Sequence, residues 1–79
     1  MKEVTFKVKK GVLKHNSQGR YEIPGITYFT SGEGIDLFLD DQWIKGRIEY
    51  SHKYNDYYFL NEDEGIYVYS LAGTLARCI

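Results

Sequence analysis

The sequence lacks the pairs of cysteines that stabilise many small proteins through disulfide bonds, and it has no long apolar run. A single cysteine, Cys78, excludes an internal disulfide. No stretch approaches the ~20 apolar residues of a transmembrane helix. The opening residues, "MKEVTFKVKKGV", contain no apolar run between their charges, so we expect no signal peptide, no membrane partner and a cytoplasmic protein.

Aromatic residues, by contrast, are plentiful. The 79 residues are 43% hydrophobic and 16% aromatic, with eight tyrosines, four phenylalanines and one tryptophan. This composition is far from that of a disordered chain and is sufficient for one small core. The richness in aromatic residues favours strands over helices.

Charge is unevenly distributed, although the net charge is only −1. Residues 1–20 carry six Lys or Arg and one acid, whereas residues 21–79 carry four Lys or Arg and ten acids. Two interpretations are open. Basic and acidic strands are neighbours in the fold, or the basic segment forms a patch for phosphate or an acidic partner.

Short apolar-polar alternations and turn signals recur along the whole chain. "VTFKV" and "IDLFLD" alternate with the period of a strand, and turns are predicted at residues 16–19, at Pro24-Gly25 and at residues 40–42. "SLAG" (70–73) has room for no more than one 3₁₀ turn. The pattern predicts an all-β domain over residues 1–79, a small barrel of five to eight short antiparallel strands. Residues 1–30 form an N-terminal strand and hairpin extension, and residues 31–79 form the barrel itself.

The same alternation predicts the core. Its expected members are Val4, Phe6, Ile35, Leu37, Leu39, Ile44, Ile48, Ile66, Val68 and Leu75.

The strand around the only tryptophan raises a specific question. Alternation over residues 43–50 places Trp43, Lys45, Arg47 and Glu49 on one face, and Ile44, Gly46, Ile48 and Tyr50 on the other. A core cannot accept unpaired Lys, Arg and Glu, so the isoleucine face points inward and Trp43 lies partly exposed on the outer face. In the competing interpretation, a bulge at Gly46 turns Trp43 inward to cap the barrel.

The stretch "SGEGIDLFLDDQWIKGRI" resembles SH3 domains. Like them, it has a glycine turn, an alternating strand, an acidic turn and a tryptophan followed by an apolar-Lys-Gly-Arg run. The resemblance covers about residues 31–79 and implies an SH3-like barrel in which Trp43 contacts ligand. Peptide-binding SH3 domains also carry an acidic-aromatic stretch and a Pro-Ser-x-Tyr motif, which this chain lacks, so proline-rich recognition does not follow.

The whole chain also resembles a family of small, uncharacterised bacterial domains. The features that carry this resemblance are "GRYEI", "TSGEGI", "WIKGRIEY" and "YYF", followed by a last strand with Arg77. It implies a bacterial accessory protein associated with mobile elements and with no assigned activity.

Residues able to support catalysis or metal binding do not converge in the sequence. His15 and His52 lie in separate predicted turns without a nucleophile pattern, and Cys78 is expected to be a small buried apolar residue. "NEDEG" (61–65) has the glycine of a calcium loop at the wrong position, so a hairpin turn is expected. We therefore expect no enzyme, no metal and no cofactor.

Two surfaces remain as candidates for binding. The aromatic and basic residues proposed to contact a ligand are Trp43, Lys45, Arg47, Tyr67 and Tyr69. The proposed basic patch consists of Lys7, Lys9, Lys10, Lys14 and Arg20. We expect a non-catalytic module, monomeric or weakly oligomeric, that binds a protein or peptide partner. The alternative is a nucleic-acid-binding accessory domain, since small barrels stack bases on aromatic residues beside basic ones.

Overall fold

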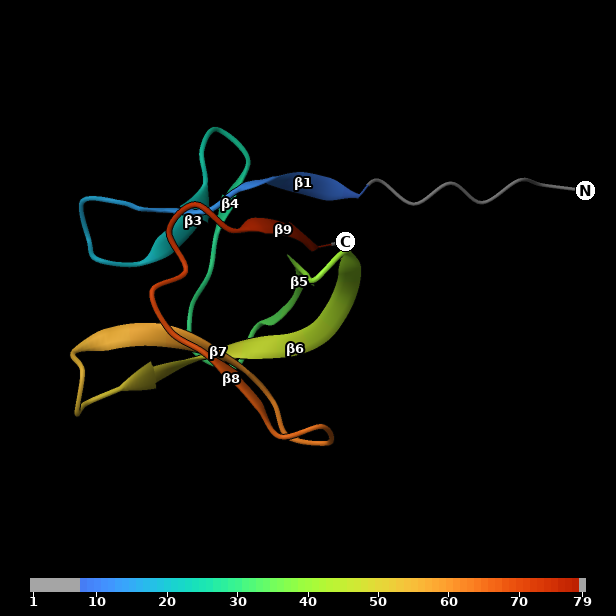
Figure 1. Cartoon of the computed structure of the whole chain (residues 1–79). Coiled ribbons are helices and arrows are strands. Elements are labelled where there is room, and N and C mark those ends of the chain that lie inside the picture. The colour runs from blue at the N-terminus through green and yellow to red at the C-terminus, as the bar shows by residue number, and fades with distance from the viewer. Residues whose placement is uncertain (1–7, 79) are drawn as a thin grey trace, which may run out of the picture.

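A computed structural model describes residues 8–78, in which all regular structure is β-strand (Figure 1). The prediction of an all-β antiparallel fold is confirmed, with nine strands in this range rather than five to eight. The strands are β1 (Lys9–Val12), β2 (Lys14–His15), β3 (Tyr21–Ile23), β4 (Thr27–Tyr28), β5 (Gly34–Leu39), β6 (Gln42–Ser51), β7 (Asp56–Asn61), β8 (Ile66–Val68) and β9 (Leu75–Cys78).

The strands form two antiparallel sheets. The large sheet has the order β1-β9-β5-β6-β7-β8, and the small sheet has the order β2-β3-β4. The ten-residue strand β6 is strongly curved, so that β1 and β9 lie across from β7 and β8 (Figure 1). No helix in residues 8–78 has the length and apolar character needed to cross a membrane.

The chain passes between the two sheets at two corners. At the first, the N–H of Leu13 donates to the carbonyl of Thr74, and the carbonyl of Leu13 accepts from the N–H of Gly73. These bonds extend the pairing of β1 with β9 up to the start of β2. At the second corner, the N–H of Gly32 donates to the Ile48 carbonyl, which ties the segment between β4 and β5 to β6. Shared corners of this kind hold two packed sheets in one orientation.

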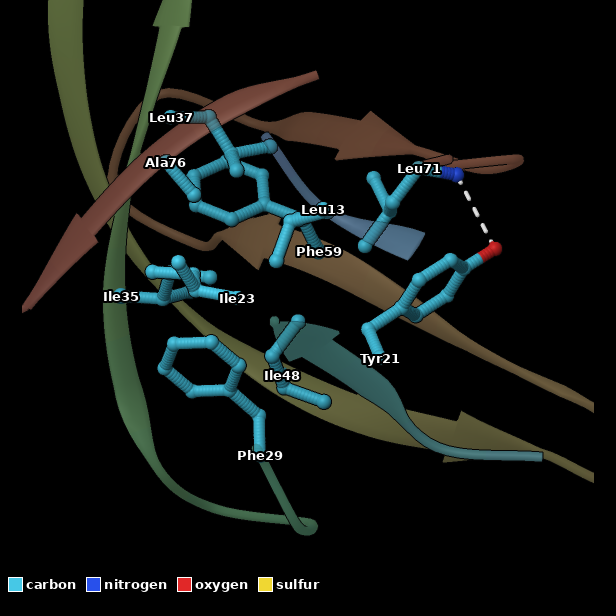
Figure 2. Close-up of a cluster of buried hydrophobic side chains, with 10 residues drawn as sticks. All are labelled: Leu13, Tyr21, Ile23, Phe29, Ile35, Leu37, Ile48, Phe59, Leu71 and Ala76. Carbon is cyan, nitrogen blue, oxygen red and sulfur yellow. Dashed lines mark hydrogen bonds between the residues drawn. The ribbon is translucent and has the colours of Figure 1, made fainter. Parts of the chain in front are cut away.

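The core lies between the sheets (Figure 2). Its buried members are Leu13, Tyr21, Ile23, Phe29, Ile35, Leu37, Ile48, Phe59, Leu71 and Ala76, and Leu60 is also buried. The N-terminal hairpin and the segments beside it therefore pack into the same core as residues 31–79.

The predicted core was right for the long central strands. Ile35, Leu37 and Ile48 are buried as expected. Four further residues are only partly buried against the core: Leu39, Ile44, Ile66 and Val68. Val4 and Phe6 lie outside the described residues.

Two parts of the predicted core were wrong. In β9 the fully buried residue is Ala76, and Leu75 is half-buried on the opposite side. The prediction also missed Leu13, Tyr21, Ile23, Phe29, Phe59 and Leu71. Tyr21 and Ile23 lie in the three-residue strand β3, which is too short to show alternation, and Leu13, Phe29 and Leu71 lie between strands, where no period applies. Phe59 lies in a run of four apolar residues (57–60) in β7, which has no alternation from which an inward position could be predicted.

Most turn predictions are confirmed. The side chain of Asn16 accepts from the N–H groups of Gln18 and Arg20 and closes the first hairpin. Gly25 has φ 76, as the third residue of a type II turn after Pro24 requires. Within the predicted limit of one turn, "SLAG" leads into a turn that the bond from the Thr74 N–H to the Leu71 carbonyl closes.

Candidate functional site

Trp43 lies on the outer face of the large sheet, half-buried, as predicted for that strand. It pairs with Phe38 across β5 and β6, and the two rings meet edge to face at 5.2 Å. The guanidinium of Arg77 lies 4.2 Å from the Trp43 ring centroid. Arg77 is held there by Asp36, whose Oδ2 accepts from Nε at 3.0 Å. One face of the indole is therefore already occupied by a cation of the same chain.

The competing interpretation, with a bulge at Gly46, is wrong. Pairing of β5 with β6 runs unbroken from Gly34 opposite Arg47 to Leu39 opposite Gln42. Gly46 instead lets the chains approach closely, because a Cβ there would overlap the Phe59 ring and the Leu60 carbonyl. The inward face thus carries Ile44, Gly46 and Ile48, as predicted, whereas Tyr50, predicted on the same face, is exposed and packs on Tyr57.

The two basic residues of β6, Lys45 and Arg47, differ in how far carboxylates of the same chain already engage their charges. Lys45 is exposed, opposite Asp36 in the register. Arg47 donates from Nε to Glu49 at 2.9 Å and from Nη2 to Glu62. Bonds to the carboxylates of Glu62 and then Glu49 raise the pKa of the Arg47 guanidinium. Its charge is thus already paired within the chain.

The predicted basic patch is divided between two sheets. Lys10 pairs with Arg77 on the outer face of the large sheet, whereas Lys9 shares the other face of β1 with Gly11. Lys14 faces Glu22 within the small sheet, and Arg20 at the end of its hairpin turn donates to Gln18 at 2.7 Å. Lys7 lies outside the described residues.

A different basic row appears on the outer face. Lys10, Arg77, Asp36 and Lys45 follow one another across β1, β9, β5 and β6. No local pattern groups Arg77 with these lysines, because the neighbours of β9 in the sheet are remote in the chain.

The two predicted tyrosines of the C-terminal half belong to a larger cluster. Tyr67 stacks on Tyr58 with ring centroids 6.4 Å apart, and Tyr69 stacks on Tyr58 at 5.2 Å. Tyr54 meets Tyr69 edge to face, also at 5.2 Å. Tyr54, Tyr67 and Tyr69 are 58%, 56% and 48% exposed. These four residues are called the tyrosine surface below.

The tyrosine surface has an apolar base. Leu60, which pairs with Tyr67 and Arg47 on the outer face, is nevertheless buried. Tyr58 and Tyr67 lie on the same face of β7 and β8 as Leu60, and three of the four tyrosines expose about half of their area. Aromatic side chains with this combination of rigid packing and exposure are typical of protein-recognition surfaces.

At one edge of this surface is a hollow of about 450 Å³, lined by Tyr54, Asp56, Tyr69 and Ser70. Asp56 is anchored from two sides: Oδ1 accepts from His15 Nε2 at 2.9 Å, and Oδ2 accepts from Tyr21 Oη at 3.1 Å. Ser70 has φ 58, a strained conformation for a residue with a side chain. Strain of this kind gathers at functional positions.

Tyr54, Tyr58 and Asp56 were not among the residues predicted from the sequence. The signal was present in "YNDYY" (54–58), where tyrosines flank an acid next to a turn. A tyrosine pattern in a loop has no period from which a face can be predicted, so these residues were not assigned to a surface.

The remaining candidates for catalysis or metal binding are His15, His52, Cys78 and residues 62–65. His15 stacks on the Tyr21 ring at 4.1 Å, and His52 meets the edge of Tyr50. Cys78 is half-buried against the core, and burial raises the pKa of its thiol. Residues 62–65 form the expected hairpin turn. Among residues 8–78 no three metal-ligating side chains come together.

Comparison with models of protein families gave a match. Residues 11–78 match the model of a family described as "Domain of unknown function (DUF5348)". Searches of the curated proteins and of the solved structures found no match.

Proposed function

Because the chain belongs to the DUF5348 family, whose description carries no activity, we propose a function from the surface itself: a non-catalytic module that binds a protein or peptide partner through the tyrosine surface. The observation that carries this proposal is the layer of four tyrosines in mutual ring contact, three of them about half exposed. Tyrosine supplies a large amphipathic contact area at low conformational-entropy cost, and it is enriched among residues that dominate binding energy.

The surroundings of Cys78 and His15 support the proposal that the module is non-catalytic. A cysteine whose pKa is raised by burial, as in Cys78, is a poor nucleophile, because the thiolate is the reactive form. His15 is engaged with Asp56 and packed on Tyr21.

The test is selection of peptides from a displayed random library, followed by calorimetric titration of the enriched peptides. We expect Tyr67→Ala to weaken their binding at least tenfold, about 1.4 kcal/mol. The matched control is Tyr28→Ala, since Tyr28 is 55% exposed but lies in the small sheet. Its effect should stay within about twofold of wild type. Failure to enrich any peptide, or equal effects of the two substitutions, would contradict the proposal.

Nucleic acid is the second candidate, and one observation favours it. Lys10, Arg77 and Lys45 lie in a row beside the aromatic pair Phe38 and Trp43. Against it, Asp36 lies between the cations and Arg77 already covers one face of the indole. Binding of single-stranded DNA that falls steeply with salt and is lost in Lys10→Gln/Lys45→Gln would establish this candidate in place of the first.

We further propose that the two sheets are a variant of the SH3-like barrel. The curved β6, the two corners at which the chain changes sheets, and the approach of Gly11 to Ile23 between β1 and β3 support this. An experimental structure in which the small sheet packs away from β1 and β6 would contradict it.

A bacterial origin and an association with mobile elements complete the proposal. They are supported by the resemblance carried by "GRYEI", "TSGEGI" and "WIKGRIEY". Genes of conjugative or other mobile elements should lie beside the genes of family members. If the genes beside those of family members do not belong to mobile elements, this part of the proposal is wrong.

A further inference from the structure

The hollow beside the tyrosine surface has a definite chemistry. Two tyrosines, Tyr54 and Tyr69, and the acid Asp56 are among the residues that line it. Its volume is about 450 Å³ and it is open to the surface, so it has room for the end of a partner's side chain. Aromatic walls combined with one carboxylate favour a cation, because the ring faces carry partial negative charge.

The hydrogen bonds of Asp56 leave one position for a ligand. Oδ1 accepts from His15 Nε2 at 2.9 Å and from the N–H of Tyr57 at 2.8 Å, which uses both of its lone pairs. Oδ2 accepts one bond among the described residues, from Tyr21 Oη. A second lone pair of Oδ2 therefore remains available, on a side chain that is 30% exposed. The carboxylate is rigidly held and can accept one further N–H.

A cation of this chain already uses one of these rings. Lys53 Nζ lies 5.3 Å from the centroid of Tyr54, within the range of a cation–π contact. The ring thus attracts a positive charge in the free protein. Lys53 would compete with any incoming cation for Tyr54.

We propose that this hollow takes the cationic side chain of an arginine in the partner, with the guanidinium against Tyr54 and Tyr69 and one N–H donated to Asp56. The proposal rests on the proposed function and names the chemistry that the partner must carry. Arginine fits better than lysine because its planar guanidinium stacks on aromatic rings and is more weakly hydrated.

The first test uses a small probe in place of a partner. Capped arginine amide is titrated into the full chain, and amide chemical shifts are followed. We expect saturable shifts centred on residues 54, 56, 69 and 70, with a dissociation constant of about millimolar order. Capped citrulline amide has nearly the same shape without the charge, and it should give shifts at least fivefold smaller. Equal shifts with both probes, or shifts centred elsewhere, would overturn the proposal.

Three variants sharpen this test. Tyr54→Ala removes an exposed wall while the carboxylate stays, and it should weaken arginine binding at least fivefold. Lys53→Gln removes the internal competitor, and it should strengthen binding about two- to fivefold. Asp56→Asn should weaken binding and abolish the preference over citrulline. Its fold must first be verified from the amide spectrum, because Asp56 also accepts from His15 and Tyr21. Unchanged affinity in Tyr54→Ala and Lys53→Gln would reject the site.

The library selection separates the two proposals. Enriched peptides that depend on Tyr67 but carry no arginine, and that bind Tyr54→Ala as well as wild type, would reject the arginine site and leave the proposed function standing. Conversely, arginine amide binding at the hollow without any peptide that depends on Tyr67 would support the site and reject the proposed function.

Discussion

The backbone N–H of Leu71 donates a hydrogen bond of 3.0 Å to Tyr21 Oη, which joins residues 50 positions apart (Figure 2). The same hydroxyl donates to Asp56 Oδ2 at 3.1 Å. Tyr21 is 1% exposed, so its ring belongs to the core while its hydroxyl satisfies two polar groups from other segments. This phenol links the small sheet to β7 and to the segment before β9, and it also helps to orient Asp56 in the hollow.

Removing this hydroxyl should destabilise the domain. Tyr21→Phe keeps the ring but leaves the Leu71 N–H without its partner, so we expect a loss of about 1–3 kcal/mol in the free energy of unfolding. Urea denaturation measures the change. Tyr28→Phe, on an exposed ring of the same small sheet, should stay within about 0.5 kcal/mol of wild type. Equal effects would show that the bond to Leu71 contributes little.

The same residue makes stability depend on alkaline pH. Burial raises the pKa of the Tyr21 hydroxyl above its ordinary value of 10.0; the bond from Leu71 opposes this shift and the charge of Asp56 adds to it. Above about pH 10 the unfolded chain therefore loses this proton while the folded chain still holds it. The contribution of the Tyr21 hydroxyl to the free energy of unfolding is fully present below pH 10. It is lost as the pH rises toward the pKa of this hydroxyl in the folded protein.

Unfolding measured between pH 8 and 11 should show this decline, and Tyr21→Phe should make it less steep. The measurements are made on protein that carries Cys78→Ser. Burial also raises the pKa of the Cys78 thiol, and the contribution of that thiol to stability falls above about pH 9. An unchanged slope in Tyr21→Phe would contradict the assignment.

The close approach at Gly46 predicts a position intolerant of any side chain. A Cβ there would overlap the Phe59 ring and the Leu60 carbonyl, and neither can move freely in a packed sheet. We expect Gly46→Ala to cost about 1–3 kcal/mol or more, as overpacking does. Gly34→Ala is the matched control in the neighbouring strand, because its Cβ would meet nothing nearer than 4.0 Å. Comparable stability of the two variants would argue against the packing described here.

Trp43 should couple energetically to Arg77. The contact at 4.2 Å is a cation–π interaction at a half-buried site, worth about 0.5–1 kcal/mol. A double-mutant cycle with Trp43→Ala and Arg77→Ala measures that coupling. We expect Trp43→Ala alone to cost about 1–2 kcal/mol, since the edge-to-face contact with Phe38 is also lost. A cost of about 3 kcal/mol or more would place Trp43 among the core residues.

The turn between β5 and β6 offers a stabilising substitution. Asp40 and Asp41 have φ of 49 and 61, the left-handed values that a two-residue hairpin turn requires. Asp-Gly is preferred in such turns, so Asp41→Gly should raise the free energy of unfolding by about 0.5 kcal/mol. Asp41→Ala removes the same charge but keeps a Cβ, and it should not stabilise. An equal gain from both would assign the effect to charge repulsion.

Local sequence was sufficient wherever a strand is long and its neighbour is its hairpin partner. Residues 35–39 and 43–48 alternate clearly, and a two-residue turn joins them, so their inward face and the outward position of Trp43 were predictable. The strongest turn signals, Asn16–Gly19 and Pro24-Gly25, likewise depend on residues that are adjacent in the chain.

Only the tertiary structure decided which remote segments meet. Arg77 lies over Trp43 because β9 inserts between β1 and β5, an order that no local pattern encodes. Asp56 joins His15 and Tyr21 because the small sheet packs beside the β6–β7 hairpin. The sequence by itself thus determined strand phase, turns and the all-β class, since these follow from the period of the backbone. The burial of apolar surface between segments distant in the chain decided the rest. It placed the N-terminal hairpin in the core, divided the basic residues between two sheets and formed the tyrosine-lined hollow.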